Sequence, residues 1–128
     1  MKNISLIILL FTFSFCYSQD WKLIGEVSND TYYYKPNTRD TAWIKVVSEK
    51  TEYESKESQK LITVDGYKLI LQKFNCRNKK LGTIEMYVYS EDGKLLDSYK
   101  EEEIFVQMDY VIPDTLGEDL LQTFCKLN

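Results

Sequence analysis

Residues 81–99 read LGTIEMYVYSEDGKLLDSY and decide the kind of sheet that this chain builds. From Leu81 to Ser90, apolar side chains alternate with polar and tyrosine side chains, as in a half-buried strand. Glu91-Asp92-Gly93-Lys94 then leads into a second run, from Leu95 to Tyr99. An Asp-Gly pair between two such runs is typical of a hairpin, so the sequence predicts antiparallel strands here.

Further strands are predicted upstream, because the chain is rich in the Tyr, Val, Ile and Thr residues that strands favour. The predicted strands are residues 21–27, 31–35, 41–49, 61–64 and 67–76. In the first of these, Trp21, Leu23 and Val27 alternate with polar residues and are expected to share the buried side. Asp65-Gly66 predicts a turn between the last two strands. Residues 48–60 are almost wholly polar and predict an exposed, mobile segment.

The C-terminal part predicts one helix. Residues 104–112 fit one more short strand or a loop packed on the sheet. Thr115 and Glu118 then have the spacing of a capping box, in which each side chain bonds a free backbone amide at the start of a helix.

Leu116, Leu120 and Phe124 recur at helical spacing and define one apolar face over residues 116–126. The predicted fold class is therefore α+β, with about six antiparallel strands and a C-terminal helix packed on one face. A small β-barrel plugged by the helix is the alternative.

The first 18 residues resemble a secretory signal peptide, with Lys2 ahead of an apolar stretch and small residues before a cut near Gln19. The apolar stretch is short for a transmembrane anchor. Cys16 would anchor the protein if it carried a lipid, but bulky Phe15 precedes it, where lipoprotein signals usually have a small residue. The sequence thus predicts export to the periplasm, the outer-membrane surface or the medium. Residues 19–128 are predicted to form a single domain.

The composition excludes several classes of function. The chain has 128 residues with 16 Lys+Arg, 20 Asp+Glu and no His, so catalysis or metal binding through His is absent. Removing the signal removes Lys2 and no acid, and an acidic domain is a poor general binder of nucleic acid. Gly-rich phosphate loops, GxSxG and CxxC motifs are also missing. We therefore expect no cofactor, no metal and no enzymatic activity.

Two cysteines, Cys76 and Cys125, remain after export. An isolated pair in a small exported domain most often forms a disulfide. The alternative, a free catalytic thiol, would lack a His partner.

The residues chosen as a partner-binding site are Tyr32, Tyr34 and Lys35, next to the loop of residues 36–40. Alternation along a strand places Tyr32 and Tyr34 on one side and Tyr33 on the other. Paired tyrosines beside a loop that begins with Pro36 would give a contact surface of low conformational entropy. The polar segment 48–60 is the rival site. Arg77, Lys79 and Lys80 form a basic turn that could hold an anion.

The order of these features resembles the surface-adhesin protein E family of bacterial envelope proteins. The matching elements are Trp21 with Ile24-Gly25, Tyr33-Tyr34 before a Pro-containing loop, Trp43-Ile44-Lys45, Asn75-Cys76, Tyr89 with Asp92-Gly93-Lys94, and Ile112-Pro113-Asp114-Thr115 with Gly117-Glu118 and Cys125.

The resemblance implies a twisted antiparallel sheet, a C-terminal helix packed on it and a Cys76–Cys125 disulfide. It also implies a non-catalytic binding module at the cell surface that attaches to host extracellular-matrix proteins. A periplasmic structural or accessory protein with no host ligand is the alternative function.

Overall fold

The computed structural model describes residues 21–55 and 59–127. The elements are β1 (Lys22–Val27), β2 (Asp30–Pro36), β3 (Thr41–Glu54), β4 (Leu61–Asn75), β5 (Lys80–Ser90), β6 (Leu95–Lys100), the 3₁₀ turn η2 (Glu103–Phe105), β7 (Asp109–Tyr110) and α2 (Leu116–Leu127). The predicted signal peptide, with Cys16, lies outside the described residues.

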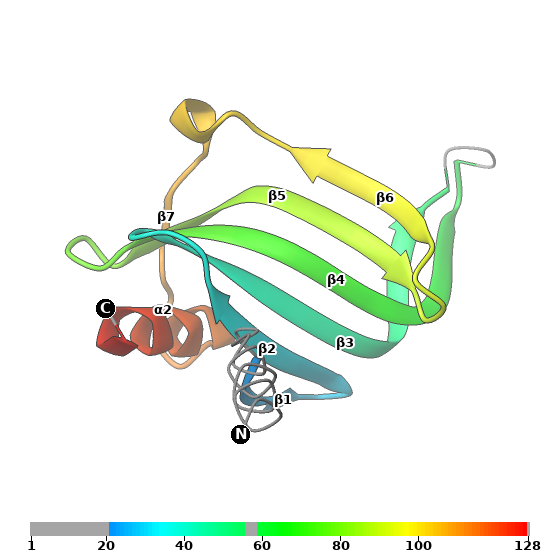
Figure 1. Cartoon of the computed structure of the whole chain (residues 1–128), viewed down its shortest axis with the longest axis horizontal. Helices are drawn as coiled ribbons and strands as arrows, with labels where there is room; N and C mark the ends of the chain where they lie inside the picture. Colours follow the sequence, from blue (N-terminus) through cyan, green and yellow to red (C-terminus); the bar gives the residue numbers. More distant parts are fainter. Residues whose placement is uncertain (1–20, 56–58, 128) are drawn as a thin grey trace, which may run out of the picture.

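The strands form one antiparallel sheet in the order β1-β2-β3-β4-β5-β6, with β7 paired to the start of β5 (Figure 1). Consecutive strands are neighbours, as short connections favour. After β6 the chain passes through η2 and β7 and returns to the other end of the sheet as α2 (Figure 1). The predicted α+β class is confirmed. In the part of the chain described here, β1 and β6 do not pair with each other, so the sheet is open and not a barrel.

Residues 81–99 form the hairpin that their sequence predicts. Strands β5 and β6 pair from Tyr89↔Leu95 to Glu85↔Lys100. The turn between them places Gly93 at φ 88°, a backbone conformation that glycine adopts without strain. The region 104–112, predicted as a short strand or a packed loop, contains η2 and the two-residue strand β7.

The core lies between α2 and one face of the sheet. The sheet contributes Tyr34, Ala42, Ile44, Val46 and Phe74, and the helix contributes Leu120, Leu121 and Phe124. The rings of Phe74 and Phe124 stack, with centroids 4.3 Å apart. The predicted helix face is confirmed for Leu120 and Phe124, and Leu116 packs at its edge. Burying each such side chain contributes about 1.5–3 kcal/mol.

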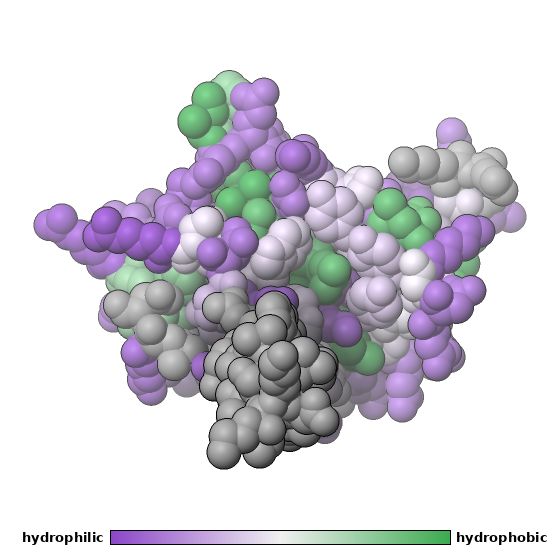
Figure 2. Space-filling model, viewed as in Figure 1, coloured by the Kyte–Doolittle hydropathy of each residue, from purple (hydrophilic) through white to green (hydrophobic). Residues whose placement is uncertain are grey.

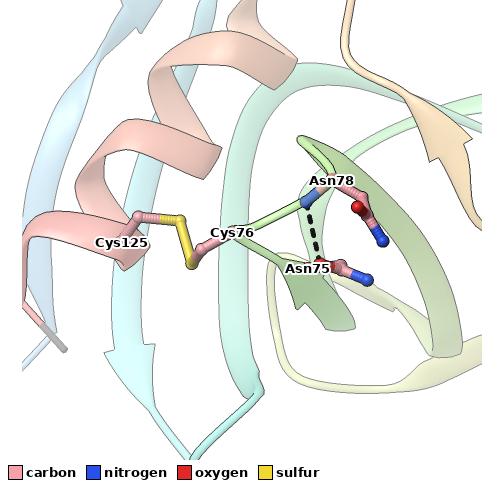
Figure 3. Close-up of a disulfide and its surroundings, with 4 residues drawn as sticks. All are labelled: Asn75, Cys76, Asn78 and Cys125. Carbon is pink, nitrogen blue, oxygen red and sulfur yellow. Dashed lines mark hydrogen bonds between the residues drawn. A yellow bond between two sulfur atoms is a disulfide. The ribbon is translucent and has the colours of Figure 1, made fainter.

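A disulfide links the same two elements. Cys76, just after β4, is bonded to Cys125 in α2, with the two Cα atoms 5.8 Å apart (Figure 3). The turn after Cys76 is held by the backbone N–H of Asn78, which donates to Asn75 Oδ1 at 3.0 Å (Figure 3). The predicted disulfide is therefore confirmed.

Two predictions about the middle of the chain are wrong. Asp65-Gly66 is not a turn, because β4 runs unbroken from Leu61 to Asn75. Most of the polar segment 48–60 is strand, because β3 continues to Glu54 and pairs with β4 from Thr51↔Val64 to Glu54↔Leu61. Residues 56–58 lie outside the described residues.

A β-bulge explains both errors. The pairs Ser48↔Gly66 and Thr51↔Val64 leave two residues of β3 opposite Asp65 alone. Such a bulge bends a strand sharply, and Figure 1 shows the long strands β3 and β4 turning away together at this end of the sheet. A polar, Gly-containing sequence there marks a bend within a strand pair and not the end of one.

The predicted buried side of β1 is wrong, because a second bulge interrupts this strand. The pairs Leu23↔Tyr33 and Gly25↔Tyr32 leave Ile24 as an extra residue. Ile24 packs against the core, whereas Leu23 and Val27 are exposed at 63% and 47%. The alternation that the sequence shows is thus interrupted by one inserted residue.

The start of α2 differs from the predicted capping box. The Thr115 hydroxyl donates to the Ile112 carbonyl at 2.6 Å instead of accepting from an amide of the helix. Glu118 does reach back, but its Oε2 accepts the N–H of Asp114 at 2.6 Å. Asp114 is in the left-handed region, with φ 61°, and forms the turn that leads into the helix.

The bend generates a first prediction. A Cβ added at Gly66 would lie 2.0 Å from the backbone oxygen of Tyr89, whereas one added at Gly25 meets nothing within 4 Å. We expect Gly66→Ala to lower the free energy of unfolding by about 1–3 kcal/mol, because the strands must move apart. Gly25→Ala is the matched control, and its free energy of unfolding should stay within about 1 kcal/mol of that of the unchanged protein. Urea unfolding measures both, and equal midpoints would contradict the argument.

The disulfide generates a second prediction. The two cysteines are 49 positions apart, so breaking the bond should cost roughly 4 kcal/mol through the entropy of the unfolded chain. Urea unfolding of the oxidised protein and of the reduced, alkylated protein measures this difference. The native protein should have no thiol that can be alkylated in residues 19–128, and two such thiols would refute the bond.

Candidate binding face

The antiparallel register places the side chains of the sheet on two faces. One face carries the core beneath α2. On the other face the register aligns Tyr33 with Lys45, Trp43 with Leu71, Tyr67 with Tyr89 and Leu69 with Tyr87. We call this second surface the aromatic face, and its aromatic members are Trp21, Tyr33, Trp43, Tyr67, Tyr87 and Tyr89. All six side chains are partly exposed.

Two lysines lie among these rings. Lys45 Nζ is 4.9 Å from the ring centroid of Tyr67 and 6.0 Å from that of Trp21. Lys35 Nζ approaches the same Trp21 ring at 5.8 Å. Each contact has the geometry of a cation–π interaction, which contributes about 0.5–1 kcal/mol at an exposed site. The lysines therefore add positive charge to the face and hold its rings in place.

The rings also support one another. Tyr67 and Tyr89 stack with centroids 5.0 Å apart and an angle of 16° between their planes. Trp43 and Tyr87 lie 6.3 Å apart at a tilted angle. Because neighbouring rings already restrict these side chains, a partner that docks here would lose little rotamer entropy.

One tyrosine of the face has a fixed hydrogen bond. The Tyr87 hydroxyl donates to Glu85 Oε2 at 3.0 Å, and Glu85 Oε1 forms an ion pair with Lys100 Nζ at 3.5 Å. The hydrogen bond to Glu85, with lesser contributions from desolvation and the Glu85 charge, raises the pKa of Tyr87 above its ordinary value. Tyr87 therefore remains neutral at physiological pH.

A groove of about 600 Å³ opens at the bulged end of the aromatic face. Lys45, Val47 and Tyr67 line it, together with the carboxylate residues Glu49, Asp65 and Glu91. The groove thus combines an aromatic ring and a lysine with three acids, a mixture suited to a polar protein surface.

The structure separates the three residues chosen as a binding site. Tyr34 has an exposed fraction of 0% and belongs to the core, so the prediction that it docks a partner is wrong. Tyr32, on the same side, is partly buried beside α2, and its pKa is raised by that burial and by the charge of Asp30. Lys35 lies on the aromatic face. Tyr32 and Tyr34 do share one side of β2, as the alternation predicts. Whether that side is buried or exposed depends on where α2 packs.

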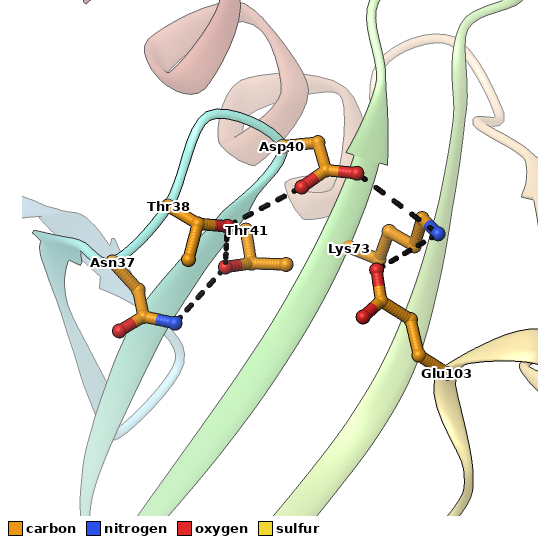
Figure 4. Close-up of polar contacts among 6 residues, drawn as sticks. All are labelled: Asn37, Thr38, Asp40, Thr41, Lys73 and Glu103. Atoms are coloured by element: carbon orange, nitrogen blue, oxygen red, sulfur yellow. Dashed lines mark hydrogen bonds and ion pairs between the residues drawn. The ribbon is translucent and has the colours of Figure 1, made fainter.

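The adjoining loop 36–40 is held by side-chain contacts. Asn37 Nδ2 donates to Thr41 Oγ1 at 3.0 Å, and the Thr38 and Thr41 hydroxyls bond each other (Figure 4). Lys73 Nζ lies 3.9 Å from Asp40 and 3.0 Å from Glu103 Oε1, which connects the loop to β4 and η2 (Figure 4).

Sequence reasoning missed most of the aromatic face, although part of the signal was present. Alternation in residues 81–90 already placed Tyr87 and Tyr89 on the side opposite the apolar residues. The alignment of Tyr67 and Trp43 with them depends on the register of β3, β4 and β5, which includes two bulges. A pattern within one strand does not contain that information.

The basic turn of residues 77–80 and the tip formed by η2 carry fewer aromatic side chains than the aromatic face. In the basic turn, Lys80 Nζ lies 4.3 Å from the Tyr110 ring centroid, whereas Arg77 and Lys79 are exposed. Figure 2 shows apolar side chains at the tip formed by η2, where Ile104 and Phe105 are exposed at 81% and 67%. No group of three or more potential metal ligands occurs within the described ranges. None of the helices in those ranges is long and apolar enough to cross a membrane.

The comparisons with known proteins identify the family. The family model described as surface-adhesin protein E matches residues 21–126, so the chain belongs to that family. Searches of curated proteins and of solved structures give no match. Membership implies an exported protein of the cell surface and, in general, one without catalytic activity.

Proposed function

We propose that this protein is a binding module of the bacterial cell surface that attaches to proteins of the host extracellular matrix through its aromatic face. Residues 1–18 would direct its export, and residues 19–128 would form the mature domain. The observation that carries the proposal is the set of six aromatic side chains, with Lys35 and Lys45 among them, on the sheet face opposite α2.

The physical properties of this face support a protein partner. Tyrosine, tryptophan and positively charged side chains are enriched where protein interfaces are strongest, because large rings bury much area with few rotatable bonds. Here the rings are partly exposed and already ordered by stacking and by the lysines. Of the residues chosen from the sequence, Lys35 fits this proposal, and Tyr32 would contact a partner only from the opposite face.

A third prediction tests the aromatic face by truncation. We expect the double variant Tyr67→Ala with Lys45→Ala to weaken binding to immobilised matrix proteins such as laminin, fibronectin or collagen by roughly tenfold or more, as loss of an interface hot spot does. Surface plasmon resonance measures the affinity, and circular dichroism checks that the variant is folded.

The chain supplies a matched control for this experiment. Tyr110 and Lys80 form the same type of ring–ammonium contact at another place, with Tyr110 exposed at 72%. Tyr110→Ala with Lys80→Ala should therefore leave matrix binding unchanged. If the control pair abolishes binding and the first pair does not, the basic turn is the docking site and the aromatic face is not.

A fourth prediction separates a surface module from a periplasmic accessory protein. Protease added to intact cells should remove the protein while leaving a periplasmic marker untouched, because only an outward-facing domain is accessible. Full protection of the protein until the outer membrane is broken would reject the surface location.

A further inference from the structure

Lys35 and Lys45 occupy neighbouring positions on the aromatic face. The register pairs Tyr33 with Lys45, so Lys35, two residues further along β2, lies diagonally across from Lys45. Residues at such diagonal positions are roughly 7–8 Å apart, which is within reach of long side chains. Both ammonium groups approach the Trp21 ring, with Lys35 Nζ 5.8 Å and Lys45 Nζ 6.0 Å from its centroid. Two positive charges from adjacent strands are therefore held beside one indole ring.

Neither of these ammonium groups has a carboxylate partner within the described ranges. Lys100, on the same face, pairs with Glu85 at 3.5 Å, whereas the ion pairs among the described residues do not involve Lys35 or Lys45. Both lysines are half-buried, so water screens their charges less than it would at a fully exposed position. An anion that docks beside Trp21 would thus receive two charge-assisted hydrogen bonds, which are stronger than neutral ones.

The surroundings of Lys45 limit that anion to an isolated charge. Lys45 also lines the groove at the bulged end of the face, together with the exposed carboxylate residues Glu49, Asp65 and Glu91. Among the described residues these three carboxylates form no ion pair. They would repel the further charges of a densely anionic chain such as a sulfated polysaccharide. A single carboxylate with uncharged neighbours fits, because its two oxygens match the two ammonium groups.

The rings beside the lysines favour a protein side chain as the source of this carboxylate. Trp43 lies directly opposite Lys35 in the register, and both it and Trp21 are partly exposed. Apolar side chains that flank an Asp or Glu in a protein segment would bury area against these rings. A carboxylated sugar would instead bring hydroxyl groups that lose water against the same rings.

We propose that the segment of the matrix protein that docks on the aromatic face presents one Asp or Glu side chain, whose carboxylate binds the ammonium groups of Lys35 and Lys45 beside Trp21. Apolar neighbours of that residue pack on Trp21 and Trp43. The inference rests on the proposed function, since it names the chemical group by which the partner is recognised there.

Substitutions of the two lysines provide the first test, with surface plasmon resonance on immobilised laminin, fibronectin or collagen. Lys35→Gln and Lys45→Gln should each weaken binding about tenfold or more, because a charge-assisted hydrogen bond is lost. Lys35→Arg and Lys45→Arg keep the charge and should retain most of the affinity. Lys100→Gln is the matched control on the same face and should leave binding unchanged, because Glu85 already pairs with Lys100.

Chemical modification of the matrix protein provides the second test. Amidation with carbodiimide and glycinamide converts its carboxylates to neutral amides. It should weaken binding of the unchanged protein about tenfold or more and have a much smaller effect on the double variant Lys35→Gln with Lys45→Gln, since interacting groups are not additive. An equal loss for both proteins would show that the lysines only hold Trp21 in place and would overturn the proposal.

The source of the carboxylate is tested by removing sugars. Treatment of the matrix protein with sialidase and heparan sulfate lyase should leave its affinity unchanged. A loss of binding after this treatment would show that the anion belongs to a glycan and would overturn the proposal.

Failure of this inference is distinguishable from failure of the proposed function. If Tyr67→Ala with Lys45→Ala weakens matrix binding but Lys35→Gln and Lys45→Gln do not, the rings dock the partner without an anion. That result would overturn the inference and leave the proposed function standing. Absence of binding of the unchanged protein to all of these matrix proteins would reject the proposed function itself.

Discussion

The packing of α2 on one face of the sheet is the contact on which the rest of the structure depends. The stacked rings of Phe74 and Phe124 and the Cys76–Cys125 bond join the end of β4 to the helix within a short stretch of chain. A single open sheet of this size has two faces, and within residues 21–55 and 59–127 α2 is the one α-helix that can cover either of them. The helix therefore decides which face becomes core and which remains available for other molecules.

The bulge in β3 has consequences on both faces of the sheet. It bends the long β3–β4 pair next to Gly66, where β4 approaches β5 too closely for any side chain. On one side the bend forms the end of the aromatic face, where Lys45 and Tyr67 line a groove with Asp65. On the other side it places Thr51 at the end of a second groove, which lies beside α2. Polar residues that look like a loop in the sequence are thus the structural origin of both grooves.

The candidate site could be predicted only in part. Strand alternation correctly placed Tyr32 with Tyr34 and Tyr87 with Tyr89, because the period of two is a local property of the backbone. Which of these pairs is buried is not local. Tyr34 contributes to the core because its strand position lies beneath α2, and Tyr87 is partly exposed because its side chain lies on the opposite face from α2. The aromatic face joins rings from several strands, so it exists only once the register is set.

The sequence by itself determined the hairpin of residues 81–99, the antiparallel sheet, the amphipathic C-terminal helix and the pairing of two cysteines, because each follows from a local pattern or a count. Only the tertiary structure decided the inserted residue in β1, the continuation of β3 through polar residues and the faces to which the tyrosines belong. The packing of α2 decides the faces of the tyrosines, and a bulge decides the other two. A bulge shifts all later side chains by one position, and its cost is offset by contacts with strands and a helix distant in sequence.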